Sequence, residues 1–312
     1  MCGGNLTIFH VGKAGKINKI MDKYQEALAA SKVLSDDAAV AAEVQKIVEK
    51  APEYASPEVW QFLFSSIDLT TLSTEDSVSS VAKFTQRVND FDNDYPQFKN
   101  VAAICVYSNF ADVVKSHLDV PGVDVCVVAG GFPSSQTFQA VKVADVALAV
   151  EGGADEVDIV LNVGQFLDGN YEDLTDEIIE LKHTARGAKL KVILETGALK
   201  TAENIKRASV LAMYSDADFI KTSTGKIYPG ASLEAAWVMC QCIKEYYELT
   251  GRKVGFKAAG GVRTSEDALR YYAIVKEVLG DEWLCQDLFR LGASSLANSI
   301  LSTMTGEEVK YF

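Results

Sequence analysis

The stretch DEVDIVLN, residues 155–162, carries the clearest signal of the fold. Apolar and polar side chains alternate along it, which is the pattern of a β-strand with two different faces. Val157 and Ile159 share the face that suits a covering layer of helices, so Asp158 between them points the other way. If the strands close into a barrel, that other face is turned to the barrel axis, so we expect Asp158 to point inward.

The same kind of short apolar run recurs seven more times along the chain. These runs are FLFSSIDL (62–69), VAAICVY (101–107), VDVCVVAG (123–130), KLKVILET (189–196), ADFIKTS (217–223), VGFKAAG (254–260) and DLFRLGA (287–293). Segments with helical spacing separate them, over residues 74–90, 109–117, 135–152, 171–186, 200–215, 232–249, 265–279 and from about 294. Eight strand–helix units in roughly 240 residues match the size of a (β/α)8 barrel.

We therefore predict an α/β fold, a (β/α)8 TIM barrel, over residues 62–312. An open doubly wound sheet is the structural alternative, but no GxGxxG motif follows a strand to favour it. Residues 12–50 are rich in Ala, Lys, Glu and Val at helical spacing, and Pro52 and Pro57 interrupt the pattern just beyond them. We expect residues 1–61 to form an N-terminal helical extension packed on the barrel.

Composition narrows the classes of function. A net charge of −13 argues against nucleic acids and anionic membranes as partners. No run approaches the roughly 20 apolar residues that span a bilayer, and residues 1–16 show no secretory pattern. Six cysteines are scattered without a CxxC pair, so we expect free thiols and a cytoplasmic protein. The three histidines share no motif, so we expect no metal, no cofactor and no Ser-His-Asp triad.

Charged side chains inside the predicted strands need a reason, because burying an unpaired charge costs several kcal/mol. Asp158, Lys221 and Lys257 stand near the ends of three strands, where barrel enzymes keep their active sites. We interpret these three as functional. A paired structural network and a functional role both remain open for the other charged strand residues Lys191, Glu195 and Arg290.

The three functional residue types suggest one chemistry. A lysine attacks a carbonyl only as a neutral amine, whereas an unperturbed lysine has a pKa of about 10.4. Desolvation and a neighbouring cation favour the neutral form, and Lys257 supplies that cation if it and Lys221 both point to the barrel axis. Asp158 provides a carboxylate that moves protons directly or through a water. We predict a class I aldolase in which Lys221 forms a Schiff base with an aldehyde.

Three glycine-containing turns follow the last three predicted strands and predict a phosphate site. Glycine lets backbone N–H groups approach an anion closely, and barrels often bind phosphate after strands seven and eight. Any one of these turns alone is equally well explained as an ordinary tight turn. We assign substrate and phosphate binding to Thr222, Gly225, Lys226, Gly260, Gly261, Arg263, Gly292, Ser294 and Ser295.

Eight motifs occur in order between Ile67 and Asn298. They are IDLTTL, AICVY, VAGGFPSSQT, GADEVDIVLN, LKVILETG, ADFIKTSTGK, VGFKAAGGVRT and FRLGASSL. With these motifs the chain resembles the deoxyribose-phosphate aldolases. The resemblance implies reversible cleavage of 2-deoxy-D-ribose 5-phosphate to acetaldehyde and D-glyceraldehyde 3-phosphate, so phosphosugars and aldehydes are the implied partners.

The resemblance also implies roles for single residues. The lysine of FIKTSTGK, here Lys221, is the Schiff-base former. The lysine of GFKxAGG, here Lys257, assists proton transfer, and the aspartate of EVD, here Asp158, is the proton-relay carboxylate. Asp68 and Cys105 fall at family positions that line the floor of the site.

The chain departs from the family pattern in several places. Ala258 stands where the family commonly has proline after the second lysine, which removes a rigid φ but no reactive group. Residues 108–110 replace the more usual proline-containing turn. Tyr311 lies near the C-terminus, from where a tyrosine reaches the active site in some relatives. A homodimer is the expectation from base rates alone.

Two other functions remain open from the residues alone. One is another Schiff-base barrel aldolase, transaldolase-like or specific for keto acids. The other is a barrel that has lost catalysis and binds phosphosugars or serves as a scaffold. A buried lysine pair without a task only costs stability, which argues against the second alternative.

Overall fold

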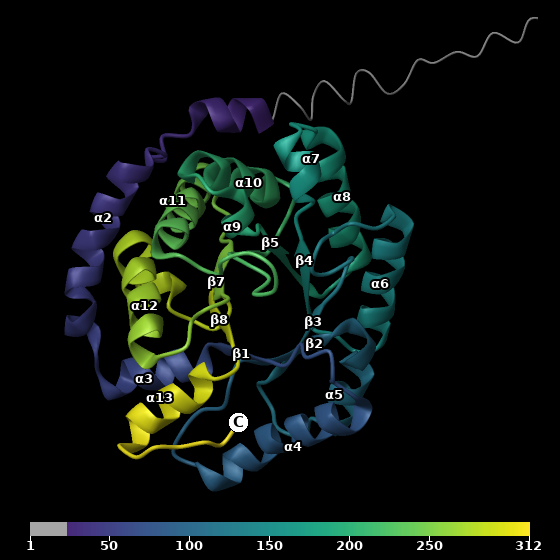
Figure 1. The fold of residues 1–312 in the computed structure, drawn as a ribbon, viewed down its shortest axis with the longest axis vertical. Helices are drawn as coiled ribbons and strands as arrows, with labels where there is room; N and C mark the ends of the chain where they lie inside the picture. Colours follow the sequence, from purple (N-terminus) through teal and green to yellow (C-terminus); the bar gives the residue numbers. More distant parts are fainter. Residues whose placement is uncertain (1–23) are drawn as a thin grey trace, which may run out of the picture.

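The computed structural model describes residues 24–312 (Figure 1). Parallel strands β1 to β8 form a closed barrel in chain order, with helices around it, so the prediction of a (β/α)8 barrel is confirmed. The strands are β1 Ile67–Thr70, β2 Ala103–Tyr107, β3 Asp124–Val128, β4 Glu156–Val160, β5 Lys189–Ile193, β6 Phe219–Lys221, β7 Gly255–Ala259 and β8 Phe289–Ala293.

Helices connect the strands and cover the outside of the barrel. The α-helices are α2 Asp37–Lys50, α3 Pro57–Ser65, α4 Val78–Asp94, α5 Ala111–His117, α6 Gln139–Glu151, α7 Val163–Leu167, α8 Tyr171–Thr184, α9 Thr196–Leu199, α10 Ala202–Tyr214, α11 Leu233–Thr250, α12 Ser265–Leu279 and α13 Leu296–Thr305. Three short 3-10 helices are η1 Ala51–Tyr54, η2 Ser108–Phe110 and η3 Asp281–Trp283. The short helices α7 and α9, which follow β4 and β5, have no counterpart in the sequence prediction.

The predicted first strand, residues 62–69, is wrong over its first half. Helix α3 occupies that part of the chain because Pro57 starts it and the Ser56 side chain accepts a hydrogen bond from the N–H of Val59. Its apolar side chains, Leu63 among them, pack against the barrel from outside, and β1 begins at Ile67. The proposed division of the chain between residues 61 and 62 falls inside this helix.

The described part of the N-terminal extension lies against the barrel's helical layer. Residues 24–30 are helical, and α2 packs against α11 and α12 (Figure 1). Asp36 caps α2, and Asp37 accepts a hydrogen bond from the N–H of Ala202 at the start of α10. Residues 12–23 of the predicted helical region lie outside the described residues. No helix in the described part of the chain is long and apolar enough to cross a bilayer.

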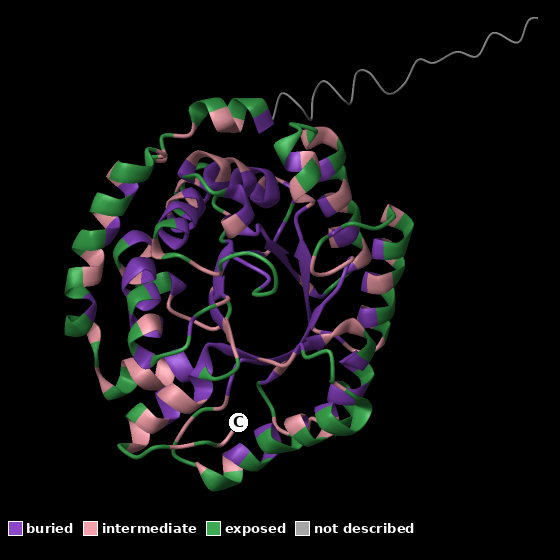
Figure 2. Ribbon diagram, in the orientation of Figure 1, coloured by how far each residue is buried: buried purple, intermediate pink, exposed green. Residues whose placement is uncertain are grey.

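Strand parity sorts the charged residues as predicted. The strands are buried, while the outward faces of the helices are exposed (Figure 2). Ile220 belongs to the apolar core, and Asp218, on the same face of its strand, pairs with Lys182 and Arg252. The opposite face presents Lys221, whose register partner on β7 is Lys257. Both lysines are therefore turned into the barrel.

Candidate active site

Asp158 of β4 lies at the centre of a cluster of buried charged groups. Its Oδ2 accepts hydrogen bonds from Lys221 Nζ at 2.7 Å and from Lys257 Nζ at 2.8 Å. Its Oδ1 accepts from Lys191 Nζ at 3.1 Å and from Cys126 Sγ at 3.4 Å. The structure thus brings together the three residues predicted to be catalytic, although they come from three different strands.

A second set of ion pairs continues from this cluster into the barrel. Lys257 Nζ lies 2.5 Å from Asp68 Oδ2, and Arg290 donates to Asp68 Oδ1 at 2.6 Å. Arg290 also donates to Glu156 Oε1 at 2.9 Å, and Lys191 donates to Glu156 Oε2 at 2.5 Å. Lys191 and Arg290, left open by the sequence, are therefore members of a paired network. That network is also joined to the predicted catalytic residues, because Lys191 donates both to Asp158 and to Glu156.

Burial and pairing act in opposite directions on these groups. Burial raises the pKa of Asp158, but the surrounding lysines outweigh burial, and its pKa lies well below the ordinary value. Burial lowers the pKa of Lys257, but the carboxylates of Asp158 and Asp68 outweigh burial and raise it. Asp158 is consequently a carboxylate and Lys257 a cation at neutral pH.

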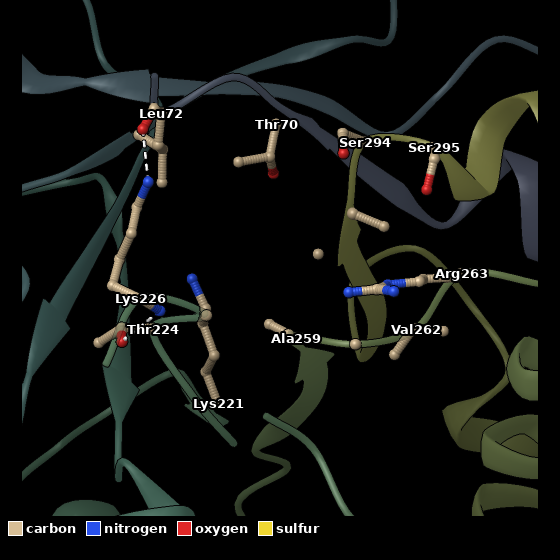
Figure 3. A pocket seen from close by; sticks show the side chains of 15 residues that line it. Thr70, Leu72, Lys221, Thr224, Lys226, Ala259, Val262, Arg263, Ser294 and Ser295 are labelled. Atoms are coloured by element: carbon tan, nitrogen blue, oxygen red, sulfur yellow. Dashed lines mark hydrogen bonds between the residues drawn. The ribbon is translucent and has the colours of Figure 1, made fainter. Parts of the chain in front are cut away.

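A cavity of about 280 Å³ opens beside Lys221 at the C-terminal ends of the strands (Figure 3). Lys221 and Arg263 point into it from facing sides. Lys226 turns instead towards the carbonyl oxygen of Leu72, to which its Nζ donates at 2.5 Å. The cavity is lined by Thr70, Leu72, Lys221, Thr224, Gly225, Lys226, Ala259, Gly260, Gly261, Val262, Arg263, Gly292, Ala293, Ser294 and Ser295.

Two glycines of this wall are fixed by their backbone and their neighbours. Gly260 has a φ of +82°, and a Cβ there would lie 3.0 Å from the Cα of Gly230 and 3.2 Å from the Cα of Gly225. A Cβ at Gly292 would lie 3.0 Å from Cε of Lys257. Any larger residue would strain the turn or displace the lysine. The wall of the cavity opposite Lys221 therefore consists of exposed backbone, together with the cationic side chain of Arg263.

Five predicted site residues lie outside the lining of the cavity, namely Asp158 and Lys257 of the buried cluster and also Thr222, Asp68 and Cys105. Thr222 is buried, and its hydroxyl donates to the carbonyl of Ala259 and accepts from its N–H, which ties β6 to β7. Its assignment to substrate binding stays a prediction. Asp68 and Cys105 are buried in the barrel and contact the cluster, and their assignment to the floor of the site stays a prediction.

The sequence prediction missed other residues that shape the site. Thr70 and Leu72 line the cavity, and both belong to the motif IDLTTL, which was the available signal. Glu195, whose role the sequence left open, has a φ of +56° and accepts hydrogen bonds from the hydroxyl of Thr224 at 2.6 Å and from its N–H at 3.2 Å. Glu195 therefore holds the loop that follows Lys221 and does not contact the lysine cluster in any described bond.

Among the described residues, two buried groups have the composition of a metal site. They are Cys105 with Cys126 and Asp158, and Asp68 with Cys126 and Glu156. The carboxylates of both groups already accept from lysine or arginine. A divalent cation would have to displace those side chains, so neither group is arranged as a resident metal site.

The C-terminal tyrosine lies away from the cavity. The hydroxyl of Tyr311 donates to Asp94 Oδ2 at 2.8 Å, and its ring packs edge-on against Phe91 and Tyr95 of the α4 region. Asn298 of α13 accepts a hydrogen bond from the backbone N–H of Tyr311. In this structure Tyr311 serves to join α4 to α13.

Comparisons with known proteins agree with this geometry. The chain matches the family described as DeoC/LacD family aldolase over residues 62–297. It is 41% identical to the deoxyribose-phosphate aldolase of Mus musculus, over 86% of this chain and 89% of that protein. It is 43% identical to the deoxyribose-phosphate aldolase of Homo sapiens, over 75% of this chain and 77% of that protein.

A solved structure shares the fold. The deoxyribose phosphate aldolase from Aeropyrum pernix, described as a unique tetramer, superposes with a TM-score of 0.63 at 23% identity. The superposition covers 83% of this chain and 97% of that one. The family match covers most of the barrel, and the two mammalian relatives are identical to this chain at more than 40% of the aligned positions. The chain belongs to the DeoC/LacD family of aldolases.

Proposed function

We propose that this protein is a deoxyribose-phosphate aldolase. The reaction is the reversible cleavage of 2-deoxy-D-ribose 5-phosphate to D-glyceraldehyde 3-phosphate and acetaldehyde, through a Schiff base on Lys221. The observation that carries the proposal is the position of Lys221. It projects into the cavity and shares one oxygen of Asp158 with Lys257.

The charges of the buried cluster favour Lys221 as the nucleophile. Three carboxylates are paired with three cations in its interior, namely Asp68, Glu156 and Asp158 with Lys191, Lys257 and Arg290. Those six charges cancel, so the cluster is neutral when Lys221 is an uncharged amine. A neutral amine is the form that attacks a carbonyl.

The remaining residues account for the proton movements of the reaction. The amine of Lys221 adds to C1 of the open-chain sugar, and loss of water gives an iminium ion. Removal of the proton from the C3 hydroxyl then lets the C2–C3 bond break, and its electron pair moves into an enamine on Lys221. Asp158 and Lys257, directly or through a water, take up and return these protons. Protonation of the enamine and hydrolysis of the imine release acetaldehyde.

The glycine wall supplies the site for the phosphate of the sugar. Gly225, Gly260 and Gly261 expose backbone without side chains, and Arg263 adds a guanidinium that binds phosphate in a fork. A phosphate against this wall directs the aldehyde end of the sugar towards Lys221, across the cavity. Phosphate binding by Gly292, Ser294 and Ser295 belongs to the same proposal, since all three line the cavity.

We also propose a cytoplasmic homodimer. Cys105, Cys126, Cys240 and Cys242 are free and buried, which suits a reducing compartment. Val141 and Leu148 on the outer face of α6 leave 52% and 67% of their surface exposed, and exposed apolar patches mark protein contacts. This face is apolar except for the exposed Glu151 at its end, so we commit to a second copy of the chain. Light scattering of the wild type and of Leu148→Glu tests it, and a monomeric wild type would contradict it.

The reaction is tested by a coupled assay for glyceraldehyde 3-phosphate released from 2-deoxyribose 5-phosphate. We expect turnover that is unchanged by a chelator, because the iminium ion and not a metal accepts the electron pair. Loss of activity on chelation would overturn the Schiff-base mechanism. Turnover of a keto-acid aldol and none of 2-deoxyribose 5-phosphate would instead favour the alternative aldolase.

A further inference from the structure

Two cysteines inside the barrel take no part in the proposed cleavage. Cys105 of β2 and Cys126 of β3 are partners in the register of neighbouring parallel strands. Both are buried, at 1% and 0% exposure. Their sulfur atoms and a carboxylate oxygen of Asp158 all lie within 4.8 Å of one another. The two thiols are therefore adjacent both to each other and to the candidate proton-relay group.

The geometry of the strands suits a bond between the two sulfurs. Neighbouring strands lie about 4.8 Å apart, inside the range of about 4.4–6.8 Å that separates the Cα atoms of disulfide-linked residues. In-register side chains on adjacent strands also point to the same face of the sheet. Little backbone movement is then needed to join Cys105 to Cys126.

We propose that Cys105 and Cys126 form a redox-sensitive dithiol site whose oxidation to a disulfide switches the aldolase off. The predicted loss of activity rests on the proposed function, whereas formation of the disulfide does not depend on it. The site takes a small peroxide as its oxidant. The two thiols together lose two electrons and two protons in forming the disulfide.

The two thiols have different roles in the oxidation. The neighbouring Cys126 side chain lowers the pKa of Cys105 against the effect of burial, and Lys257 adds to the lowering, so Cys105 is the more acidic of the two thiols. Burial raises the pKa of Cys126 well above its ordinary value. Cys105 releases its proton, and the thiolate attacks an oxygen of hydrogen peroxide. The O–O bond breaks, and the leaving hydroxide takes up the released proton, so that a sulfenic acid and one water form. The sulfur of Cys126 displaces the sulfenic hydroxyl as a second water, which leaves the disulfide.

A small oxidant reaches the pair through the active-site cavity. Thr70, the register partner of Cys105 on β1, lines the cavity. Leu72 also lines it and packs in one apolar cluster with both cysteines. A phosphosugar in the cavity blocks this route. Substrate should therefore protect the thiols from peroxide.

Disulfide formation changes the surroundings of Asp158. In the reduced protein the thiol of Cys126 donates to Asp158 Oδ1 at 3.4 Å and accepts from Lys191 Nζ at 3.3 Å. A disulfide draws the two sulfurs to about 2 Å and removes the thiol proton. Asp158 loses that donor, and Lys191 loses its present contact with the sulfur but keeps its ion pairs with Glu156 and Asp158. A displacement of the order of 1 Å in such a group costs roughly a hundredfold in rate.

Two other buried cysteines offer an internal control, whereas Cys285 is partly exposed. Cys240 and Cys242 lie two residues apart on α11, where side chains do not face each other, and burial raises the pKa of both thiols. Neither is expected to react with peroxide in the folded protein. Replacing Cys242 by alanine removes a buried thiol and leaves the proposed pair intact.

The experiment treats wild type, Cys126→Ala and Cys242→Ala with hydrogen peroxide and compares each with its own reduced sample. We expect wild type and Cys242→Ala to lose two hydrogens by intact mass and to yield a linked Cys105–Cys126 peptide. Their activity should fall roughly a hundredfold and return with dithiothreitol. Saturating substrate should prevent both changes, and Cys126→Ala should form no linked peptide and keep more of its own activity.

The peptide map needs no variant and no active enzyme, so it tests the disulfide separately from the proposed reaction. Oxidised wild type without the linked peptide would overturn the inference, whatever its activity. A linked peptide with unchanged turnover would overturn the switch but leave the aldolase proposal intact. A linked peptide in a protein that never cleaves 2-deoxyribose 5-phosphate would instead count against the proposed function.

Discussion

Lys221 and Lys257 are register partners on adjacent strands and donate to the same oxygen, Oδ2 of Asp158. A slip of one residue in either strand would turn one of the lysines into the helical layer. Lys257 is held as a cation by Asp158 and Asp68, whereas Lys221 borders the cavity. This difference in surroundings is why we propose Lys221, and not Lys257, as the nucleophile.

Acetaldehyde with borohydride should label the protein on Lys221. The imine that forms there is reduced to a stable secondary amine, because Lys221 alone of the two lysines lines the cavity. Peptide mass mapping locates the label. Lys221→Met should take up no label and show no turnover. Labelling of Lys257 in the wild type would contradict the proposal, because it would show that Lys257 and not Lys221 is the nucleophile.

Asp158→Asn should lower kcat roughly 10²–10⁴-fold, the usual contribution of a positioned acid–base group. The amide keeps the shape of the side chain but cannot accept a proton from the reacting sugar. Steady-state kinetics and circular dichroism together measure the effect and check the fold. A folded Asp158→Asn protein with near wild-type kcat would remove Asp158 from the mechanism.

Arg263→Ala should raise KM for 2-deoxyribose 5-phosphate roughly tenfold and leave kcat nearly unchanged, since a charged hydrogen bond contributes about 1.5–3 kcal/mol. The guanidinium reaches into the cavity opposite Lys221. KM for unphosphorylated 2-deoxyribose should not change. Arg270→Ala is the matched control, because Arg270 is an exposed arginine of α12 that pairs with Asp267 outside the cavity. Equal effects on both sugars would argue against a phosphate contact.

Arg290→Met should lower the free energy of unfolding by about 3–5 kcal/mol, because it leaves Asp68 and Glu156 buried without their guanidinium partner. Urea denaturation monitored by fluorescence measures the change. Lys46→Met is the control, since Lys46 pairs with Glu43 on the surface, where such a pair contributes about 0–1 kcal/mol. Similar losses in the two variants would mean that the buried network adds nothing special to stability.

Stability should be nearly constant from about pH 5 to pH 9 and fall on either side. Burial raises the pKa of Asp68, Glu156 and Asp158, but their cationic neighbours lower it further. Their stabilising effect is therefore present above the unfolded pKa of about 4 and is lost as pH falls towards the folded values. Lys257 has a raised pKa in the folded state, so its contribution is present below about pH 10.4 and is lost above it.

Urea midpoints at acid, neutral and alkaline pH measure this profile. Asp158→Asn removes one of the titrating carboxylates and should flatten the acid side relative to the wild type. The same midpoint for the wild type at pH 7 and at about pH 3 would contradict the assignment of lowered pKa values to the buried carboxylates.

The amino-acid order was enough to predict the barrel and the direction of its key side chains. Alternation along a strand is a local property, so the inward position of Asp158, Lys221 and Lys257 follows from parity once a parallel barrel is inferred. The glycine-containing turns could also be predicted from the sequence, because a positive φ such as that of Gly260 favours glycine at that position. The beginning of β1 was not, because residues 62–65 are apolar enough for a strand or for the buried face of a helix, and the Ser56 cap decided between them.

Which charges meet depends on the folded barrel. Arg290 and Asp68 are 222 residues apart in the sequence. No local sequence pattern predicts the 2.6 Å hydrogen bond between them. The same holds for Cys105 and Cys126, which read as two unrelated buried thiols until the register of β2 and β3 places them side by side. Thr222 shows the reverse case, a polar residue in a binding motif whose hydroxyl is used by the backbone of Ala259. Hydrogen bonds and ion pairs depend on distances of a few ångströms between strands, and that spacing is set by closure of the barrel, not by the order of residues along one strand.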